Sequence, residues 1–162
     1  MRVLWAPWRM AYIGGPKPPG CVFCTAAESA DQRGQLVLVQ QPALVMLNKF
    51  PYANGHLMVA PRRHVAQLSA LSRDEFQVLM DVLQHATTRL TDTLKPEGMN
   101  IGMNVGAAAG AGIADHLHWH LVPRWVGDTN FMPVLAEARV MPEHLETMYD
   151  RLQPVFDGRR VG

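Results

Sequence analysis

Short apolar runs separated by turn residues mark the first half of the chain. Two runs, over residues 36–39 and 44–47, flank a Gln-Gln-Pro turn, and a third run over residues 57–59 lies between Asn54-Gly55 and Pro61. Short runs bounded by Gly, Pro and Asn are typical of β-strands. The pattern therefore predicts three strands, of which the first two form a hairpin.

A helical pattern follows in the middle of the chain. Ser72 and Glu75 form a capping-box signature, in which the side chain at each position bonds to the backbone of the other. Apolar residues then recur at helical spacing, namely Phe76, Leu79, Met80, Leu83, Leu90 and Leu94. We expect one long helix that begins after Ser72 and ends at Lys95-Pro96.

The second half of the chain predicts two more strands and a closing helix. Apolar and polar residues alternate over residues 99–105 and, strictly, over residues 116–122. Residues 142–156 predict a helix with an apolar side formed by Leu145, Met148, Tyr149 and Leu152. Strands interrupted by a single long helix favour an α+β fold with an antiparallel sheet of about five strands, in which 116–122 is a central strand.

Length and composition exclude several classes of protein. The chain has 162 residues, 48% of them hydrophobic, which suffices for one domain with a core. A net charge of +1 gives no broad basic surface, so we expect no nucleic acid polymer as a partner. No run approaches 18 apolar residues and the start lacks the apolar stretch of a signal peptide, so we expect no membrane span and a cytoplasmic location.

We expect one domain over residues 1–162. Residues 1–20 are rich in Pro and Gly and predict an extended N-terminal arm that packs through Trp5, Trp8 and Tyr12. Residues 21–135 form the predicted core, and residues 136–162 form a C-terminal tail and helix.

Three histidines alternate along the strand predicted over residues 116–122. Because side chains alternate across a strand, His116, His118 and His120 share one face, and the opposite face is apolar, with Leu117, Trp119 and Leu121. Each imidazole brings two polar nitrogens that need partners, so three of them are poor core material. A strand face that is only solvated would suit Val, Thr or Lys better. The pattern indicates either metal binding or nucleophilic catalysis by imidazole.

A loop of small residues runs directly into this strand. Residues 104–112 contain one Asn, one Val, three Gly and four Ala. Such a loop exposes backbone N–H groups and can cradle a phosphate. Next to three aligned histidines, it favours catalysis on a phosphate compound.

The only two cysteines are Cys21 and Cys24. Their spacing suits half of a zinc site, which needs two further ligands. A redox pair of the thioredoxin type would need a βαβ context, which the predicted elements do not provide. A metal site and a pair of buried thiols both stay open on the spacing alone.

Residues 116–122 resemble the signature of the histidine-triad (HIT) superfamily, His-φ-His-φ-His-φ-φ, where φ is hydrophobic. The resemblance extends over roughly residues 20–135 and includes Asn48 and residues 55–61. Residues 123–131 are similar to the continuation in bacterial dinucleoside-polyphosphate phosphorylases and hydrolases. Many members carry Gln or Ser shortly before the triad, where this chain has Ala111, Gly112 and Ile113. Its phosphate contacts would then come from backbone N–H groups.

This resemblance implies a nucleotidyl hydrolase or transferase that cleaves dinucleoside polyphosphates or other AMP-containing compounds at the α-phosphorus. His118 would be the nucleophile and carry a covalent nucleotidyl intermediate, with water or phosphate as acceptor. His120 would stabilise charge on the phosphate, and His116 would assist the leaving group or serve structure. The implied nucleotide-binding residues are Asn48, His56, Asn104, Gly110, Ala111, Gly112 and His120.

Two of these positions also have simpler interpretations. Asn48 would contact the ribose hydroxyls, or it could simply begin a turn. His56 would lie behind the triad as a hydrogen-bond partner, or it could be a half-buried strand residue. His85 and His144 are expected on the surface. The resemblance also implies a homodimer.

The resemblance further implies structural Zn²⁺. In relatives that carry the cysteine pair, two histidines complete the site, and the matching residues here are His64 and the first triad histidine. The implied ligands are Cys21, Cys24, His64 and His116, a closed tetrahedral set. Two other functions stay open: a zinc-dependent hydrolase that uses His116, His118 and His120 as ligands to an activated water, and a non-catalytic nucleotide-binding regulatory module.

Overall fold

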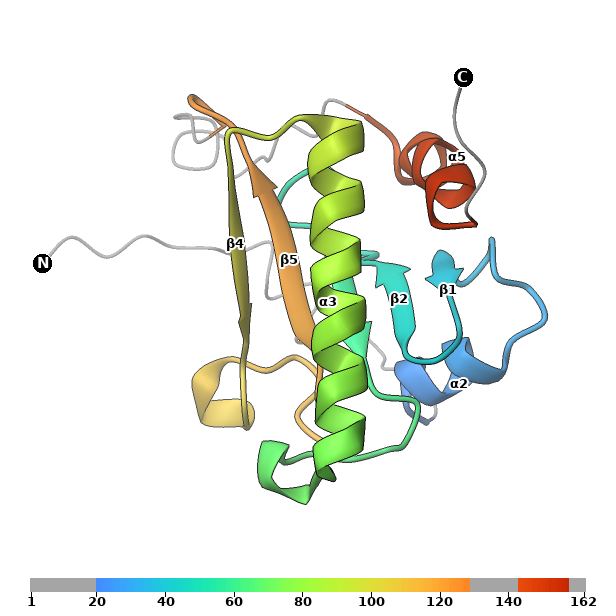
Figure 1. Cartoon of the computed structure of the whole chain (residues 1–162), viewed down its shortest axis with the longest axis vertical. Coiled ribbons are helices and arrows are strands. Elements are labelled where there is room, and N and C mark those ends of the chain that lie inside the picture. The colour runs from blue at the N-terminus through green and yellow to red at the C-terminus, as the bar shows by residue number, and fades with distance from the viewer. Residues whose placement is uncertain (1–19, 129–142, 158–162) are drawn as a thin grey trace, which may run out of the picture.

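The computed structural model describes residues 20–128 and 143–157 (Figure 1). The elements in chain order, with η for short 3₁₀ helices, are α2 (Val22–Glu28), β1 (Val37–Val39), β2 (Leu44–Leu47), β3 (Leu57–Ala60), η1 (Leu68–Ala70), α3 (Arg73–Leu94), β4 (Gly98–Met103), η2 (Ala107–Ala109), β5 (Trp119–Arg124) and α5 (Leu145–Phe156). The strands form one antiparallel sheet in the order β1-β2-β3-β5-β4. The predicted α+β fold is confirmed, and β5 lies inside the sheet as expected.

The histidine segment was only partly predicted, because β5 begins at Trp119 and not at His116. Its pairing with β3 stops at the Val59–Trp119 pair, and β3 itself ends one residue later, before Pro61. The N–H of Leu117 instead donates to the carbonyl of Val65, beyond the end of β3, at 2.7 Å. His116 and His118 therefore lie on an extended lead-in to the strand.

Other boundaries differ for local reasons. β1 begins at Val37 because Leu36 has a φ of 57°, which is incompatible with a strand. β4 ends at Met103, which pairs with the first residue of β5. The closing helix begins at Leu145, later than predicted. Apart from Gly20, the predicted N-terminal arm lies outside the described residues.

The long helix matches its prediction. Ser72 accepts a hydrogen bond from the N–H of Glu75, and the Glu75 side chain bonds back to the N–H of Ser72. Lys95 then adopts a left-handed conformation and Pro96 follows, so the helix cannot continue. Among the described residues, no helix is both long and apolar enough to cross a membrane.

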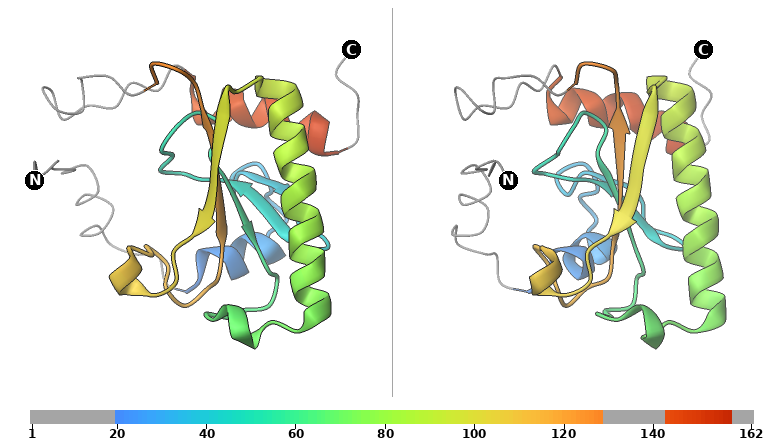
Figure 2. Two further views of the ribbon diagram at one scale, coloured as in Figure 1. Left: turned by 60° about the vertical axis from the view of Figure 1, so that its left-hand side comes forward. Right: turned by 90° about the vertical axis from the view of Figure 1, so that its left-hand side faces the viewer.

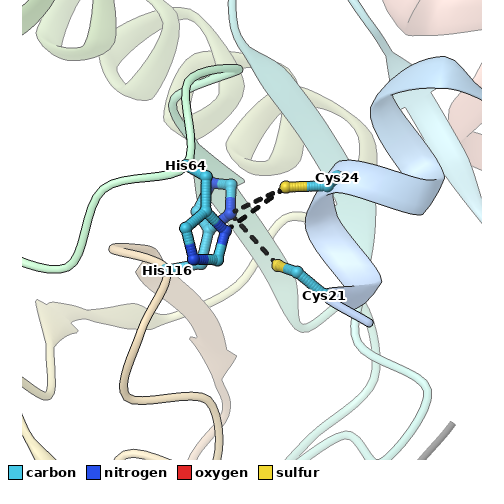
Figure 3. A group of neighbouring side chains, drawn as sticks. All are labelled: Cys21, Cys24, His64 and His116. Carbon is cyan, nitrogen blue, oxygen red and sulfur yellow. Dashed lines mark hydrogen bonds between the residues drawn. The ribbon is translucent and has the colours of Figure 1, made fainter. Parts of the chain in front are cut away.

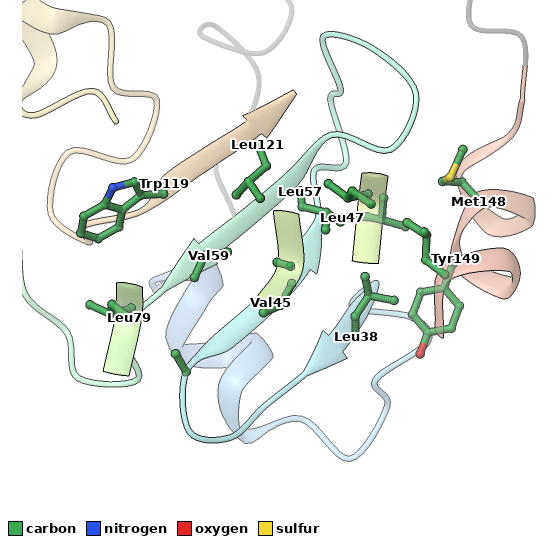
Figure 4. Close-up of a cluster of buried hydrophobic side chains, with 14 of the residues drawn as sticks. Leu38, Val45, Leu47, Leu57, Val59, Leu79, Trp119, Leu121, Met148 and Tyr149 are labelled. Atoms are coloured by element: carbon green, nitrogen blue, oxygen red, sulfur yellow. The ribbon is translucent and has the colours of Figure 1, made fainter. Parts of the chain in front are cut away.

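The two faces of the sheet carry different layers (Figure 2). One face packs on α3 and α5 through alternate strand residues, which include six that Figure 4 labels: Val45, Leu47, Leu57, Val59, Trp119 and Leu121. The other face packs on α2, where Phe23 and Ala26 meet Val37, Leu44, Met46, Met58 and Ala60. Because His120 pairs with Met58, the histidines belong to the α2 face.

Sequence reasoning missed α2. The helix has seven residues, and its N-cap residue, Cys21, makes no side-chain capping bond, so it lacks the usual start signal. Its buried residues Phe23, Ala26 and Ala27 do follow helical spacing, and this was the available signal.

Candidate functional site

The three triad histidines lie together on the α2 face of the sheet. His116 and His118 are buried, with exposed fractions of 1% and 4%, and His120 is partly buried. The rings of His118 and His120 are 4.9 Å apart and meet edge-on. Leu117, Trp119 and Leu121 join the core on the opposite face, so the predicted division between the faces is confirmed.

In the part of the chain that the structure describes, Nδ1 of His118 is hydrogen-bonded and Nε2 is not. Its Nδ1 lies 2.8 Å from the backbone carbonyl of His116, and only a protonated Nδ1 can donate to that oxygen. In the neutral ring, Nε2 then carries the lone pair. Burial lowers the pKa of His118, which favours this neutral form near pH 7.

His56 lies behind His120 and determines which ring nitrogen of neutral His120 carries the proton. His56 is fully buried, and its Nδ1 accepts a hydrogen bond from the N–H of Tyr52 at 3.1 Å. Its Nε2 must then carry the proton, and it donates to Nδ1 of His120 at 2.9 Å. Neutral His120 consequently holds its proton on Nε2. Burial, together with His118, lowers the pKa of His120 to about 4.

Asn48 has a partner for its side-chain oxygen. Oδ1 accepts from the N–H of Phe50 at 2.8 Å, which forms an Asx turn. Its Nδ2 lies 3.4 Å from Nδ1 of His56. The structure therefore shows the turn, and the contact of Asn48 with a ribose stays a prediction.

The small-residue loop forms a tight turn ahead of the triad. Gly106 and Gly110 flank η2 with φ values of 82° and 84°, which favour glycine. The N–H groups of Gly110 and Ala111 donate within the turn, to Ala107 and Gly106. Of the three loop residues predicted to bind phosphate, only Gly112 has an N–H that makes no hydrogen bond within the described part of the chain. Asn104 precedes this turn and is half-buried.

Four possible metal ligands meet at the N-terminus of α2 (Figure 3). Their ligand atoms all lie within 4.8 Å of one another, and the residues are Cys21, Cys24, His64 and His116. The two thiols come from the N-cap residue and the first turn of α2, and the two imidazoles come from the segments that follow β3 and precede β5. This is the set that the sequence predicted, and it could hold a metal ion.

The distances in this cluster suit Zn²⁺. Sγ of Cys21 lies 3.2 Å from Nδ1 of His116, and Sγ of Cys24 lies 3.4 Å and 3.6 Å from Nδ1 of His64 and of His116. A tetrahedral zinc site with its usual bond lengths separates sulfur and nitrogen ligands by about 3.5 Å. The residues present therefore fit the metal.

The protonation state of His116 also suits a bound metal ion. Nε2 of His116 donates to the carbonyl of Pro61 at 2.9 Å, which leaves Nδ1 unprotonated and facing the sulfurs. Burial lowers the pKa of His116, which favours this neutral form. Burial and the neighbouring Cys21 raise the pKa of the Cys24 thiol, and a bound cation would reverse this by stabilising both thiolates.

The geometry does not favour a metal held by the triad itself. Nδ1 of His118 binds a carbonyl, Nδ1 of His120 binds His56, and Nδ1 of His116 faces the cysteines. In the part of the chain that the structure describes, the only cluster of possible metal ligands includes one triad histidine, His116. As expected, His85 and His144 are exposed.

Three contacts in the site were not predicted from the sequence. Phe23 packs against the triad, Tyr52 stacks on His56 with ring centroids 4.9 Å apart, and the carbonyl of Pro61 binds His116. The first two are aromatic residues beside singled-out positions, but the third is a backbone contact that leaves no signal in the sequence.

Comparison with known proteins agrees with this site. Residues 29–126 match the HIT domain family. An AP-4-A phosphorylase of Mycobacterium tuberculosis is 36% identical over 151 residues, which is 88% of this chain and 77% of that protein. A zinc-bound histidine triad family protein from Mycobacterium smegmatis superposes with a TM-score of 0.66 at 26% identity, over 86% of this chain and 94% of its own.

A hypothetical histidine triad nucleotide-binding protein from Sulfolobus tokodaii shares the fold, with a TM-score of 0.67 at 23% identity over 85% of this chain and 93% of that one. The domain match spans more than half of the chain, and the mycobacterial relative aligns with most of it. With three histidines in the spacing of the signature, this chain belongs to the histidine-triad (HIT) family.

Proposed function

We propose that the protein is a nucleotidyl hydrolase or transferase that cleaves dinucleoside polyphosphates or related nucleoside phosphates through a nucleotidyl-His118 intermediate. The observation that carries this proposal is the hydrogen bond of 2.8 Å from Nδ1 of His118 to the backbone carbonyl of His116. Because the proton is on Nδ1, the lone pair of Nε2 can act as the nucleophile. Similarity to an AP-4-A phosphorylase supports the substrate class.

In the first half-reaction, Nε2 of His118 attacks the α-phosphorus. A P–N bond forms, the P–O bond to the leaving phosphate breaks, and the imidazole becomes cationic while it keeps its proton on Nδ1. The carbonyl of His116 faces that proton and stabilises the new charge. Neutral His120 donates from Nε2 to a phosphate oxygen, since its Nδ1 is bound by His56.

In the second half-reaction, an acceptor attacks the phosphorus and the P–N bond breaks, which returns His118 to its neutral form. Water as the acceptor gives a hydrolase, and inorganic phosphate gives a phosphorylase. The remaining contacts to the nucleotide come from Asn48, Asn104 and the backbone N–H of Gly112.

We assign Zn²⁺ a structural role at Cys21, Cys24, His64 and His116. Four protein ligands leave no open position, so the ion would supply folding energy and hold the chain, with no part in the bond cleavage. The N–S spacing of the cluster and the zinc-bound mycobacterial neighbour support this assignment. His116 then acts through its backbone carbonyl, and its ring is not a free acid.

We also propose a homodimer. Within the described residues β4 is an edge strand that pairs only with β5, and its residue Ile101 is 47% exposed. An exposed edge strand with an apolar side chain is a ready surface for pairing with a second copy. Sedimentation should give twice the chain mass, and a monomer at high concentration would contradict the proposal.

Single-turnover mixing with a labelled dinucleoside polyphosphate tests the mechanism directly. The expected result is a nucleotide bound to His118, identified by peptide mass spectrometry in wild type and absent from His118→Ala. Product analysis with and without inorganic phosphate then identifies the acceptor. Turnover without any adduct would favour the zinc hydrolase, and binding without turnover would favour a regulatory module.

A further inference from the structure

Phe23 is a fully buried aromatic residue that packs against the triad from a different layer of the fold. Its ring centroid lies 4.8 Å from that of His118, at an interplanar angle of 38°, and 5.0 Å from that of His116. Phe23 belongs to the first turn of α2, between Cys21 and Cys24 in the sequence.

His118 needs a constraint of this kind. The hydrogen bond from Nδ1 to the carbonyl of His116 fixes one edge of the ring, but one bond leaves the ring free to rock about it. The contact with Phe23 restricts that rocking from the α2 side, and His120 meets the ring edge-on. A small error in the direction of Nε2 is costly, because displacement of a reacting atom by 1 Å can reduce a rate by about a hundredfold.

The position of Phe23 is itself held firmly. The ring packs in the buried cluster formed with β1, β2 and β3, which includes Val37, Leu44 and Met58. Arg62 ties the end of α2 to the sheet through the carbonyls of Ala27 and Gln40, at 3.1 Å and 2.9 Å. The contact against His118 is therefore made from a supported element.

We infer that Phe23 is a positioning residue for His118: its ring holds the imidazole in the orientation that directs Nε2 toward the phosphorus. This inference rests on the proposed function, in which His118 is the nucleophile. Phe23 does not touch the reacting atoms and acts only through the ring of His118.

The test compares Phe23→Leu, which keeps apolar bulk but loses the ring, with wild type. We expect kcat for diadenosine tetraphosphate to fall by about ten- to a hundredfold, with KM changed by less than about threefold. The control is Leu152→Ala, a deletion at a fully buried position of α5, in the core cluster on the opposite face of the sheet. It should lower Tm and keep kcat at temperatures where the variant is folded.

A second readout does not depend on turnover. NMR of ¹⁵N-labelled histidine in the zinc-loaded protein without substrate reports which nitrogen of His118 carries the proton. Wild type should show one tautomer with the proton on Nδ1, and Phe23→Leu should show exchange between the two. A wild type that fails to turn over any dinucleoside polyphosphate would refute the proposed function, and NMR would then decide the role of Phe23 alone.

The remaining outcomes are decisive. With an active wild type, Phe23→Leu that leaves either kcat or the His118 spectrum unchanged overturns the inference, and so does an equal loss of kcat in Leu152→Ala. If Phe23→Leu does not fold, Phe23→Met, whose side chain is flexible enough to fill the same space, is judged by the same criteria.

Discussion

Acid should destabilise the fold through His120. The pKa of this residue is lowered from 6.5 to about 4, chiefly by burial and also by His118, so the folded protein resists its protonation. Above pH 6.5 the residue is neutral in both states and contributes nothing to the pH dependence. Between pH 6.5 and 4 the unfolded chain binds the proton and the folded chain does not, so the free energy of unfolding falls as the pH falls.

The size of this effect follows from the shift in pKa. At about 1.4 kcal/mol per pKa unit, the full loss amounts to about 3 kcal/mol. Most of this loss of unfolding free energy occurs in the first part of the acidification, with about 2 kcal/mol lost between pH 7 and pH 5. Below pH 4 the folded state also binds the proton and the contribution levels off.

Urea unfolding of wild type and His120→Asn at pH 7, 6 and 5 measures this contribution. Asparagine cannot be protonated, but its oxygen can still accept from Nε2 of His56. The cysteines, His64 and His116 are the same in both proteins, so acid release of a metal affects both curves alike. Wild type should lose about 2 kcal/mol more than the variant between pH 7 and pH 5. Parallel curves would refute the reasoning.

The other predictions concern the triad, the metal and the core. His118→Ala should abolish turnover and keep nucleotide binding, measured by calorimetry; near-normal turnover would contradict the mechanism. His120→Ala should lower kcat by about two to three powers of ten, because one donor to the phosphate is lost. Metal analysis should give one Zn²⁺ per chain, and chelation or Cys24→Ser should lower Tm under conditions where the intrinsic rate is still unchanged. If protein purified without chelator contains no zinc, His116 again becomes a candidate for acid–base catalysis. Leu90→Ala, at a fully buried position of α3, should cost about 2–5 kcal/mol in urea unfolding and leave KM unchanged.

The sequence predicted the parts of this fold that depend on periodicity. Both bounds of α3 follow from local signals, the capping box at Ser72 and Lys95-Pro96 at the end. The alternation in residues 116–121 likewise assigned the histidines and the apolar residues to their correct faces. The start of β5 was not predictable in this way, because it depends on where β3 stops pairing, and that is a contact between segments about 60 residues apart.

The site was predictable in its residues and only partly in its hydrogen bonds: a backbone carbonyl near His116 was the expected acceptor for His118, and the structure has that bond. The four cluster residues followed from the resemblance, and the structure brings them together. Which nitrogen of His120 carries the proton depends on the backbone N–H of Tyr52, through two successive hydrogen bonds that meet at His56. Backbone groups carry no residue identity, so a sequence contains no direct record of such a chain.

The alternation of faces through residues 116–121 has a consequence for how this segment can vary in length. Odd-numbered positions there face the helix layer of α3, and even-numbered positions carry imidazoles. One residue inserted after Gly112 could be absorbed by the loop, since the pairing of β5 begins only at Trp119. One residue inserted between Leu117 and Trp119 would shift the residues on one side of the insertion by one position, so that imidazoles there would turn toward α3 and apolar side chains toward the α2 face. A change in length is therefore tolerated in the loop before His116, whereas the same change between Leu117 and Trp119 disrupts the site.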